Sequence, residues 1–257
     1  MAKNGIFDLT GRVAVVTGAS SGLGVQMAKA LARQGADIAI LARRKEKLEA
    51  VAEEIRKIGV KCLPVQCDVT DTEAVKKAAD LVEAEFGKVD ILINNAGSGD
   101  TGPAEEMTDE TWEHTLNVDL SGVFKVAREF GKKMIKNKYG RIINIASMYG
   151  RVGNTALPSS AYHAAKGGVV NLTRALAAEW AKYGITVNTI CPGYFETELT
   201  VDTLNTEYFT NYMKATVPLG RYGREGELDS TAVYLASDAS SYVTGVAIPV
   251  DGGYTCV

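Results

Sequence analysis

The sequence predicts a doubly wound α/β fold, in which helices cover both faces of a parallel sheet. Short β-branched runs alternate with longer amphipathic segments along most of the 257 residues. The short runs are apolar nearly throughout, as strands must be when both faces of their sheet are buried. Because no linker, repeat or low-complexity tract interrupts this alternation, we expect a single domain over residues 1–257.

Each predicted element is identified by the period of its apolar residues. Strands are expected where β-branched and aliphatic residues run together, at residues 13–16, 37–41, 62–65, 91–93, 141–145, 186–190 and 246–250. Helices are expected where apolar residues recur with a helical period, from the first strand to residue 34 and at residues 45–58, 73–86, 109–137, 160–182 and 227–237. Right-handed crossovers through these helices make the strands parallel, which is the Rossmann arrangement.

One segment departs from the alternation of strands and helices. Aromatic and polar residues fill residues 194–221, between the sixth predicted strand and the last predicted helix. An insertion after the carboxyl end of a strand borders the ligand crevice of this kind of fold. We therefore expect a small substrate lid here, with two short helices within residues 198–219.

Composition excludes several classes of partner and site. The chain has 28 Lys and Arg against 31 Asp and Glu, a net charge of −3, so we expect neither nucleic-acid nor membrane binding. It has neither a long apolar run nor the apolar stretch of a secretory leader, which predicts a cytoplasmic protein. The partner that we expect is a small-molecule substrate. Its four cysteines are scattered and its two histidines lie far from them, so we expect reduced thiols and no metal site.

A glycine-rich turn connects the first predicted strand to the first predicted helix. Glycine permits close approach of the backbone to a pyrophosphate, and the helix start presents free N–H groups and a positive dipole end. The alternative is a tight turn that only packs the helix closely. The residues of the predicted dinucleotide-binding turn are Gly18, Ser20, Ser21, Gly22, Leu23 and Gly24.

Two arginines follow the second predicted strand, where the adenosine ribose of a dinucleotide lies. No carboxylate stands there to accept from the 2′-hydroxyl of NAD, whereas Arg43 and Arg44 can bind the 2′-phosphate of NADP. We therefore expect NADP(H) to be preferred, with NAD still possible. The alternative is that both arginines only begin a charged surface helix.

Tyr162 and Lys166 stand at the spacing that places two side chains on one helix face. A phenol has a pKa of about 10, and a neighbouring ammonium group favours its phenolate form, so the pair can exchange a proton with an alcohol or ketone. Ser147 follows the fifth predicted strand, where its hydroxyl can bind the same reacting oxygen. The alternatives are that the tyrosine and lysine have this spacing by chance and that the serine only caps the N-terminus of a helix.

These motifs together resemble the short-chain dehydrogenase/reductase family of NAD(P)-dependent oxidoreductases, which act on CH–OH groups. The resemblance implies that Tyr162 is the acid/base, that Ser147 orients the substrate oxygen, and that Lys166 holds the nicotinamide ribose. It also implies that Asn117 holds a water molecule in a proton relay. The further cofactor-binding residues that it implies are Asp68, Val69, Asn95, Ala96, Gly97, Pro192, Gly193, Phe195 and Thr197. Family members commonly form homotetramers, which we expect here.

Within that family the chain is most similar to sugar-acid and polyol dehydrogenases of the gluconate 5-dehydrogenase type. Bacterial hydroxysteroid (bile acid) dehydrogenases and 3-oxoacyl-carrier-protein reductases share most of these motifs and remain alternatives. A non-catalytic module that senses NADP(H) is an alternative of another class. The polar and aromatic residues that we expect to line the substrate site are Ser98, Asp100, Tyr149, Asn154, His163, Tyr194, Phe195, Tyr208, Phe209 and Tyr212.

Overall fold

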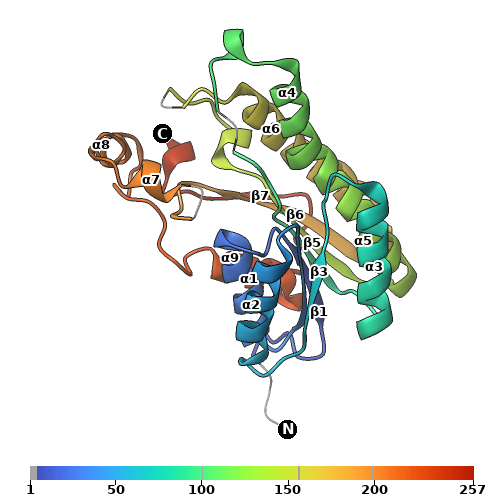
Figure 1. Cartoon of the computed structure of the whole chain (residues 1–257). Coiled ribbons are helices and arrows are strands. Elements are labelled where there is room, and N and C mark those ends of the chain that lie inside the picture. The colour runs from blue at the N-terminus through green and yellow to red at the C-terminus, as the bar shows by residue number, and fades with distance from the viewer. Residues whose placement is uncertain (1–4, 100, 156, 198–199) are drawn as a thin grey trace.

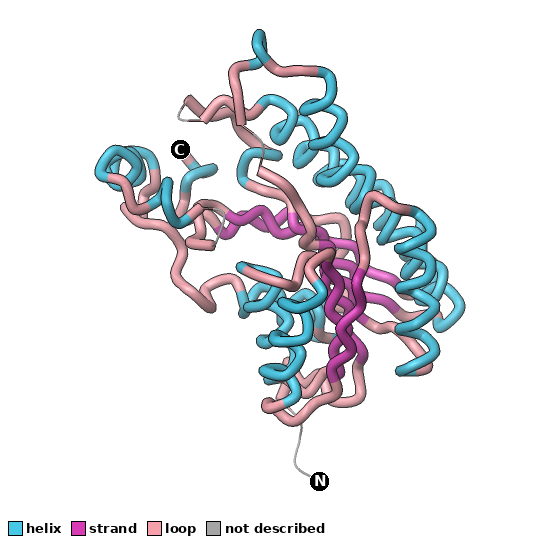
Figure 2. The backbone as a smooth tube through the Cα atoms, in the orientation of Figure 1, coloured by secondary structure: helices cyan, strands magenta, loops and turns pink. Residues whose placement is uncertain are grey.

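The computed structural model describes residues 5–99, 101–155, 157–197 and 200–257. These residues form a seven-stranded parallel sheet of order β3-β2-β1-β4-β5-β6-β7, with helices on both faces (Figures 1 and 2). The predicted doubly wound fold is confirmed. Asp100 and residues 198–199 of the predicted lid lie outside the described residues.

The strands lie within two residues of their predicted bounds. They are β1 (Val13–Thr17), β2 (Asp37–Ala42), β3 (Cys62–Gln66), β4 (Ile91–Asn94), β5 (Gly140–Ile145), β6 (Ile185–Pro192) and β7 (Ala247–Val250). Along β1, alternate side chains enter two different cores: Val13 and Val15 pack on one face of the sheet, and Ala14 and Val16 on the other. This division explains why the strand is apolar at every position.

Two groups of helices cover the two faces of the sheet (Figure 1). One core includes α1, α2 and α9, and the other includes α3, α5 and α6. The helices are α1 (Gly22–Arg33), α2 (Lys45–Arg56), α3 (Thr72–Phe86), α4 (Asp109–Leu116), α5 (Gly122–Asn137), α6 (Ser160–Trp180), α7 (Val201–Leu204), α8 (Glu207–Thr216) and α9 (Asp229–Ala236). Short 3₁₀ turns are η1 (Ala104–Glu106), η3 (Met148–Gly150), η4 (Ala181–Tyr183), η5 (Asp238–Ser240) and η6 (Tyr254–Cys256).

The predicted helical stretch over residues 109–137 is present, but its repeat changes in the middle, which the sequence analysis did not predict. A π-helical turn, η2 (Asn117–Ser121), separates α4 from α5. Such a turn adds one residue to the helical repeat and shifts the faces on which the following side chains lie. Here it directs Asp119 into the interior, where the residue is 0% exposed, while Asn117 stays on the surface.

The two short helices expected in the lid are present as α7 and α8, which lie beside the C-terminus (Figure 1). The described ends of this segment are held together. The Gly223 amide donates to the Tyr194 carbonyl at 2.8 Å, and the Tyr222 hydroxyl donates to Glu196 at 3.1 Å. A Cβ atom at Gly223 would lie only 2.3 Å from the Phe195 ring, so glycine is required where the two ends meet.

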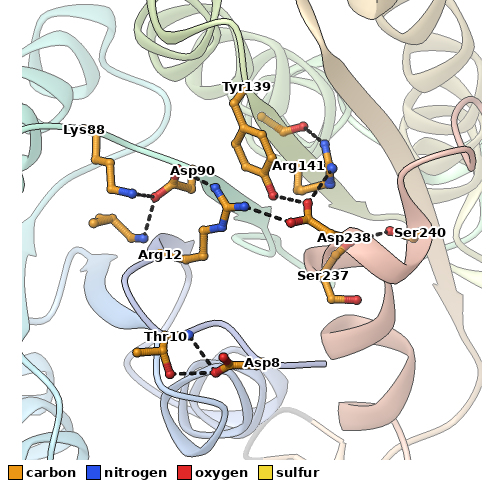
Figure 3. A network of polar contacts seen from close by, with 12 residues as sticks. Asp8, Thr10, Arg12, Lys88, Asp90, Tyr139, Arg141, Ser237, Asp238 and Ser240 are labelled. Atoms are coloured by element: carbon orange, nitrogen blue, oxygen red, sulfur yellow. Dashed lines mark hydrogen bonds and ion pairs between the residues drawn. The ribbon is translucent and has the colours of Figure 1, made fainter. Parts of the chain in front are cut away.

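A network of charged residues joins the strands at the edge opposite to the lid (Figure 3). Asp90 accepts from the Val13 amide at 2.9 Å and pairs with Lys88 at 2.8 Å and Arg12 at 3.4 Å. Arg12 also pairs with Asp238 at 2.9 Å. These contacts link the beginnings of β1 and β4 to the turn that follows α9.

Candidate active site

The glycine-rich turn has no room for side chains at two of its glycines. A Cβ atom at Gly18 would lie 2.8 Å from the Ala96 Cα atom, and one at Gly24 would lie 2.5 Å from the Gly18 carbonyl oxygen. Gly18 and Gly22 both have positive φ, at 65° and 57°. Among the described residues, no side chain caps the first turn of α1, so its N–H groups are available to an anion. The turn therefore fits a dinucleotide pyrophosphate, while Leu23 packs against the core below it.

Arg44 lies against this turn. Its Nη2 atom donates to the Ser20 hydroxyl at 3.0 Å and to the Ser21 hydroxyl at 2.7 Å. Arg43 is exposed and directly follows the carboxyl end of β2, and its charge helps lower the pKa of Asp68. The structure thus brings Arg44 to the glycine-rich turn, where a ribose phosphate of NADP would lie, and Arg43 within electrostatic range of Asp68.

Asn95 supports the turn from the neighbouring strand end. Its Nδ2 atom donates to the Thr17 carbonyl at 3.0 Å, and the Asn95 and Ala96 amides both donate to the Thr17 hydroxyl at 3.0 Å. The predicted cofactor residue Asn95 therefore shapes the turn with its side chain. Gly97 follows at the point where the backbone approaches Lys166.

Asp68 and Val69 stand beyond the end of β3, as expected for residues beside an adenine. Asp68 is partly buried, which opposes its charge, but bonds from the amide and hydroxyl of Thr70, at 2.9 and 2.7 Å, lower its pKa. Val69 contacts the start of α5, because a Cβ atom at Gly122 would lie 3.0 Å from its Cγ2 atom. This contact joins the segment that follows β3 to the first residue of α5.

The structure brings Ser147, Tyr162 and Lys166 together at the carboxyl end of β5. The Lys166 Nζ atom lies 5.4 Å from the centre of the Tyr162 ring and donates to the Ile145 carbonyl at 3.2 Å. Ser147 begins the turn η3, which packs on α6 so closely that a Cβ atom at Gly150 would lie 2.6 Å from the Lys166 carbonyl oxygen. The Ser147 hydroxyl accepts from the Tyr149 amide at 3.1 Å, so it also serves as the cap expected of a serine here.

Asp119 was missed by the sequence analysis, although it lies nearer to this cluster than the predicted Asn117. Its carboxylate pairs with Lys166 at 3.0 Å, whereas the exposed Asn117 accepts from Lys125 at 3.3 Å. Burial alone would lower the pKa of Lys166, but the charge of Asp119 opposes this effect and the pKa is raised. The side chain of Asn117 is therefore not brought to Lys166, and its relay role stays a prediction.

The residues predicted to cover the nicotinamide follow β6. Gly193 donates its amide to the Val250 carbonyl at 2.9 Å, and a Cβ atom there would lie 2.6 Å from the Asp251 Cα atom. Thr197 reaches the glycine-rich turn, since a Cβ atom at Gly22 would lie 3.3 Å from its side chain. Pro192 ends β6, and Phe195 is buried against Gly223. The lid segment thus starts beside the predicted pyrophosphate site.

Asn154 and His163 fix the loop that precedes α6. The His163 Nδ1 atom lies 2.8 Å from the Ser159 carbonyl oxygen, which can only accept, so this nitrogen carries the proton and Nε2 accepts from Asn154 at 3.1 Å. Asn154 also accepts from the Leu157 amide at 2.7 Å. The His163 ring stacks on Tyr149 with ring centres 4.6 Å apart. Asn154 and His163 therefore hold Tyr149 in place.

Four tyrosines form an aromatic wall beside Tyr162. The Tyr149 and Tyr194 hydroxyls lie 2.6 Å apart, and those of Tyr212 and Tyr254 lie 3.0 Å apart. Tyr149 meets the Tyr162 ring edge to face at 6.5 Å. Burial raises the pKa of Tyr149 to about 12 and also raises that of Tyr194, so these phenols stay neutral hydrogen-bonding groups.

Of the two neighbouring aromatic residues expected to line the site from α8, one is exposed and the other is buried. The sequence analysis also missed one residue of the aromatic wall. Tyr208 is 68% exposed and points away from the wall, whereas its neighbour Phe209 is buried and packs on Tyr194 at 5.0 Å between ring centres. Tyr254 comes from the last 3₁₀ turn of the chain and was not predicted. The Ser98 hydroxyl donates to Asp119 at 2.6 Å, and the place of Ser98 in the substrate site stays a prediction.

A metal centre and a membrane-spanning helix are both absent from the described ranges. No three histidine, cysteine or acidic side chains gather there in a way that could hold a metal ion. None of the helices described has the length and apolar character needed to cross a membrane.

The chain matches the family model described as enoyl-(acyl carrier protein) reductase over residues 18–255. Gluconate 5-dehydrogenase of Gluconobacter oxydans (strain 621H) is 38% identical over 255 residues, which cover 99% of both proteins. The 3-oxoacyl-(acyl-carrier-protein) reductase of Staphylococcus aureus (strain N315) is 39% identical over 241 residues, covering 93% of this chain and 96% of that protein. The gluconate 5-dehydrogenase of Burkholderia cenocepacia J2315, solved with NADP and tartrate, has a TM-score of 0.94 and 38% identity over 98% of both chains.

The chain therefore belongs to the short-chain dehydrogenase/reductase family, as its motifs predicted. It is an oxidoreductase that acts on CH–OH groups with a nicotinamide dinucleotide. The prediction of NADP(H) as the cofactor is confirmed by the relatives solved with NADP or NADPH. Which alcohol it oxidises is a separate question.

Proposed function

We propose that this enzyme uses NADP(H) to interconvert a ketone and a secondary alcohol on a sugar acid or polyol, as gluconate 5-dehydrogenases do. The observation that carries the proposal is the wall of paired tyrosine hydroxyls beside Tyr162. Polyols need several hydrogen-bonding partners, and the hydroxyls of Tyr149, Tyr194, Tyr212 and Tyr254 provide them within one cluster. The relative from Burkholderia cenocepacia was solved with tartrate, itself a polyhydroxylated acid.

In this proposal Tyr162 gives its phenolic proton to the ketone oxygen during reduction and recovers a proton from solvent afterwards. Ser147 donates a hydrogen bond to the same oxygen and fixes its position. Lys166 keeps a positive charge 5.4 Å from the Tyr162 ring, which favours the phenolate left behind. The nicotinamide, when bound, supplies the hydride for reduction or accepts it for oxidation.

The cofactor preference rests on the two arginines at the adenosine end. Arg44 already holds the hydroxyls of Ser20 and Ser21, and Arg43 stands exposed beside it. Two guanidinium groups at this edge suit a 2′-phosphate, and no carboxylate ends β2 to bind a 2′-hydroxyl. NADP(H) is therefore the proposed cofactor and NAD a weaker one.

A second candidate function, reduction of a 3-oxoacyl group on a carrier protein, is favoured by the Staphylococcus aureus relative. The carrier protein is recognised through its acidic surface, which needs basic residues near the site entrance. Between Thr197 and Tyr212 the sequence contains neither arginine nor lysine. Because these basic residues are missing from the segment, the second candidate function has less support than the first.

The deciding experiment compares kcat/KM for 5-ketogluconate, other keto-sugars, an oxo-bile acid and a short 3-oxoacyl thioester, with NADPH. We expect 5-ketogluconate or another keto-sugar to be best, because a steroid would leave the remaining donor and acceptor capacity of the paired tyrosine hydroxyls unused. If an oxo-bile acid exceeded the best sugar by about tenfold, or about 1.4 kcal/mol in transition-state binding, the sugar proposal would fall. Binding of NADPH without turnover of any of these ketones would favour a sensor.

We further propose that the chain acts as one domain with residues 194–221 as its lid, and that it forms a homotetramer. Trp112 on α4 and Phe124 on α5 are 40% and 41% exposed, an unusual exposure for such large apolar side chains. Burying them between subunits would remove this apolar surface from water. Light scattering at micromolar concentration should give about four times the chain mass of 27.4 kDa.

A further inference from the structure

The lid has a small hydrophobic core of its own, separate from the two cores under the sheet. The buried residues of this core are Leu204, Phe209, Met213 and Val217. Because the core does not merge with those on the faces of the sheet, the position of α8 over the site depends on the side chains packed around it. These partly buried side chains are Leu157, Tyr194, Tyr212, Tyr222 and Tyr254.

Tyr254 comes to the lid core from outside the lid, on the short turn η6. The Asp251 carboxylate shapes this turn, because it accepts from the Gly253 amide at 2.9 Å and from the Thr255 amide and hydroxyl at 3.0 and 2.7 Å. Figure 1 shows the C-terminus beside α7 and α8. Tyr254 is therefore presented to the lid by a backbone that three hydrogen bonds hold in place.

Two glycines allow the backbone before Tyr254 to pack directly on the end of the lid. A Cβ atom at Gly252 would lie 2.8 Å from the Val217 Cγ1 atom, and one at Gly253 would lie 2.9 Å from the Pro218 Cγ atom. Both glycines have positive φ, at 66° and 93°. The Gly252 carbonyl also accepts from the Leu219 amide at 3.1 Å. The end of the lid is thus attached to the segment that carries Tyr254.

The Tyr254 side chain contacts both the lid helix and the fixed part of the aromatic wall. Its hydroxyl lies 3.0 Å from the Tyr212 hydroxyl on α8. Its ring meets those of Tyr149 and Tyr194 edge to face, with ring centres 6.4 and 5.9 Å apart. Tyr149 belongs to η3, the turn that Ser147 begins. The hydroxyl and the ring of Tyr254 therefore make different contacts, which different substitutions can remove separately.

We propose that Tyr254 is a positioning and specificity-determining residue of this enzyme. Its hydroxyl holds α8 over the site through Tyr212, and its ring closes the wall against ketones bulkier than a sugar. The role of the ring rests on the proposed function, whereas the role of the hydroxyl does not. Because a small substrate is enclosed only when the lid covers it, a loosened lid should weaken binding more than it slows the chemical step.

Hydrogen exchange of the α8 amides tests the hydroxyl, in the protein without substrate or cofactor. Exchange reports how often a segment opens locally. Tyr254→Phe should speed exchange in α8 about two- to tenfold, the range that one hydrogen bond contributes, and leave exchange in α5 unchanged. Tyr212→Phe should have the same effect and the double variant no larger one, because both changes remove one shared contact. Unchanged exchange in α8, or effects of the two variants that add, would overturn the role of the hydroxyl.

Steady-state kinetics tests the ring, with the best keto-sugar as the small ketone and an oxo-bile acid as the bulky one. Tyr254→Phe keeps the ring, so it should raise KM for the keto-sugar about two- to tenfold, with kcat and the preference between the two ketones nearly unchanged. Tyr254→Ala opens the wall, so kcat/KM for the keto-sugar relative to the oxo-bile acid should fall about tenfold or more. Tyr242→Phe, at a fully exposed tyrosine, should change neither quantity.

An equal loss of kcat/KM for both ketones in Tyr254→Ala would show that the ring only stabilises the lid and would overturn its role in specificity. If this variant does not fold, Tyr254→Leu also removes the ring but keeps apolar bulk, and the same comparison applies to it. The exchange experiment requires no turnover. Faster exchange in α8 without turnover of any keto-sugar would therefore support the role of the hydroxyl while the proposed function fails.

Discussion

The amino and carboxyl ends of the parallel strands, here called the amino edge and the carboxyl edge of the sheet, each have a buried carboxylate. The two carboxylates have different kinds of partner. At the amino edge, Asp90 has two cationic partners, Arg12 and Lys88, in addition to a backbone amide (Figure 3). Arg12 in turn reaches Asp238. At the carboxyl edge, Asp119 pairs with Lys166 alone, and both side chains are almost completely buried.

This difference predicts that the amino edge serves stability and that the carboxyl edge serves chemistry. A shared network tolerates the loss of one partner, because Arg12 has a second carboxylate in Asp238 and Lys88 reaches solvent. A single buried pair has no replacement partner, so losing one charge leaves the other uncompensated. Such a pair is suited to holding one ammonium group at a fixed charge and position beside Tyr162.

Tyr162→Phe should have the largest effect on turnover and little effect on folding. The change removes the hydroxyl that carries the proton to the reacting oxygen, and general acid catalysis contributes about 10²–10⁴-fold to a rate. We expect kcat to fall by at least this factor, while thermal unfolding and NADPH binding stay close to those of the native enzyme. Tyr242→Phe, at a fully exposed tyrosine, is the matched control. Residual activity above a tenth of the native value would show that another group is the acid.

Arg44→Ala should weaken NADPH binding by about 1.5–3 kcal/mol, the range for hydrogen bonds between charged groups. The affinity for NADH should hardly change, because NADH has no 2′-phosphate. Fluorescence titration of both cofactors measures the difference, and Arg43→Ala, at the neighbouring exposed arginine, serves as the comparison. An equal loss of affinity for the two cofactors would mean that Arg44 only supports the glycine-rich turn through Ser20 and Ser21.

Asp90→Asn should lower the free energy of unfolding by about 2 kcal/mol. This is less than the 3–5 kcal/mol typical of breaking a fully buried pair, because Arg12 and Lys88 both keep access to water. Denaturant unfolding measures the loss, and kcat per folded molecule should be unchanged. If turnover fell together with stability, the two edges of the sheet would not be functionally separate.

The fold could be predicted from sequence because it depends on local periodicity. Each strand of β1 to β7 is marked by its own apolar run, and the Tyr162–Lys166 pair follows from helical spacing alone. Asp119 could not be predicted in this way, since the π-helical turn breaks the period on which the interpretation of residues 109–137 rested. A carboxylate inside an apolar helical stretch was the one available signal.

The lid shows a second limit of the sequence. Tyr208 and Phe209 are neighbours of similar aromatic character, and only tertiary packing decides that Phe209 turns inward. Tyr254 reaches the wall from the end of the chain, through a contact with Tyr212 that spans 42 positions. Contacts of this kind depend on where distant segments meet, and no local pattern specifies that.

The smallest effect that we predict is on the pH dependence of stability, through Asp229. The partners of this carboxylate differ from those of Asp90 and of Asp119. This carboxylate begins α9, where the helix dipole favours a negative charge, but its nearest cation, Arg33, is 3.9 Å away. Burial of the group prevails and raises the pKa of Asp229 from 3.8 to about 6. The folded state therefore binds a proton more tightly than the unfolded state, and stability should fall as pH rises from about 4 to about 6.

Asp229→Asn should remove this pH dependence, because asparagine carries no charge that burial can penalise. Since Asp229 is only partly buried and solvent screens part of the effect, we expect a gain of about 1 kcal/mol at pH 7 and almost none at pH 4. Denaturant unfolding of both proteins at pH 4, 5, 6 and 7 measures the difference. A constant difference across these values would show that the amide acts through packing. A gain confined to higher pH would show that an underpaired buried carboxylate costs stability, in contrast to the doubly paired Asp90.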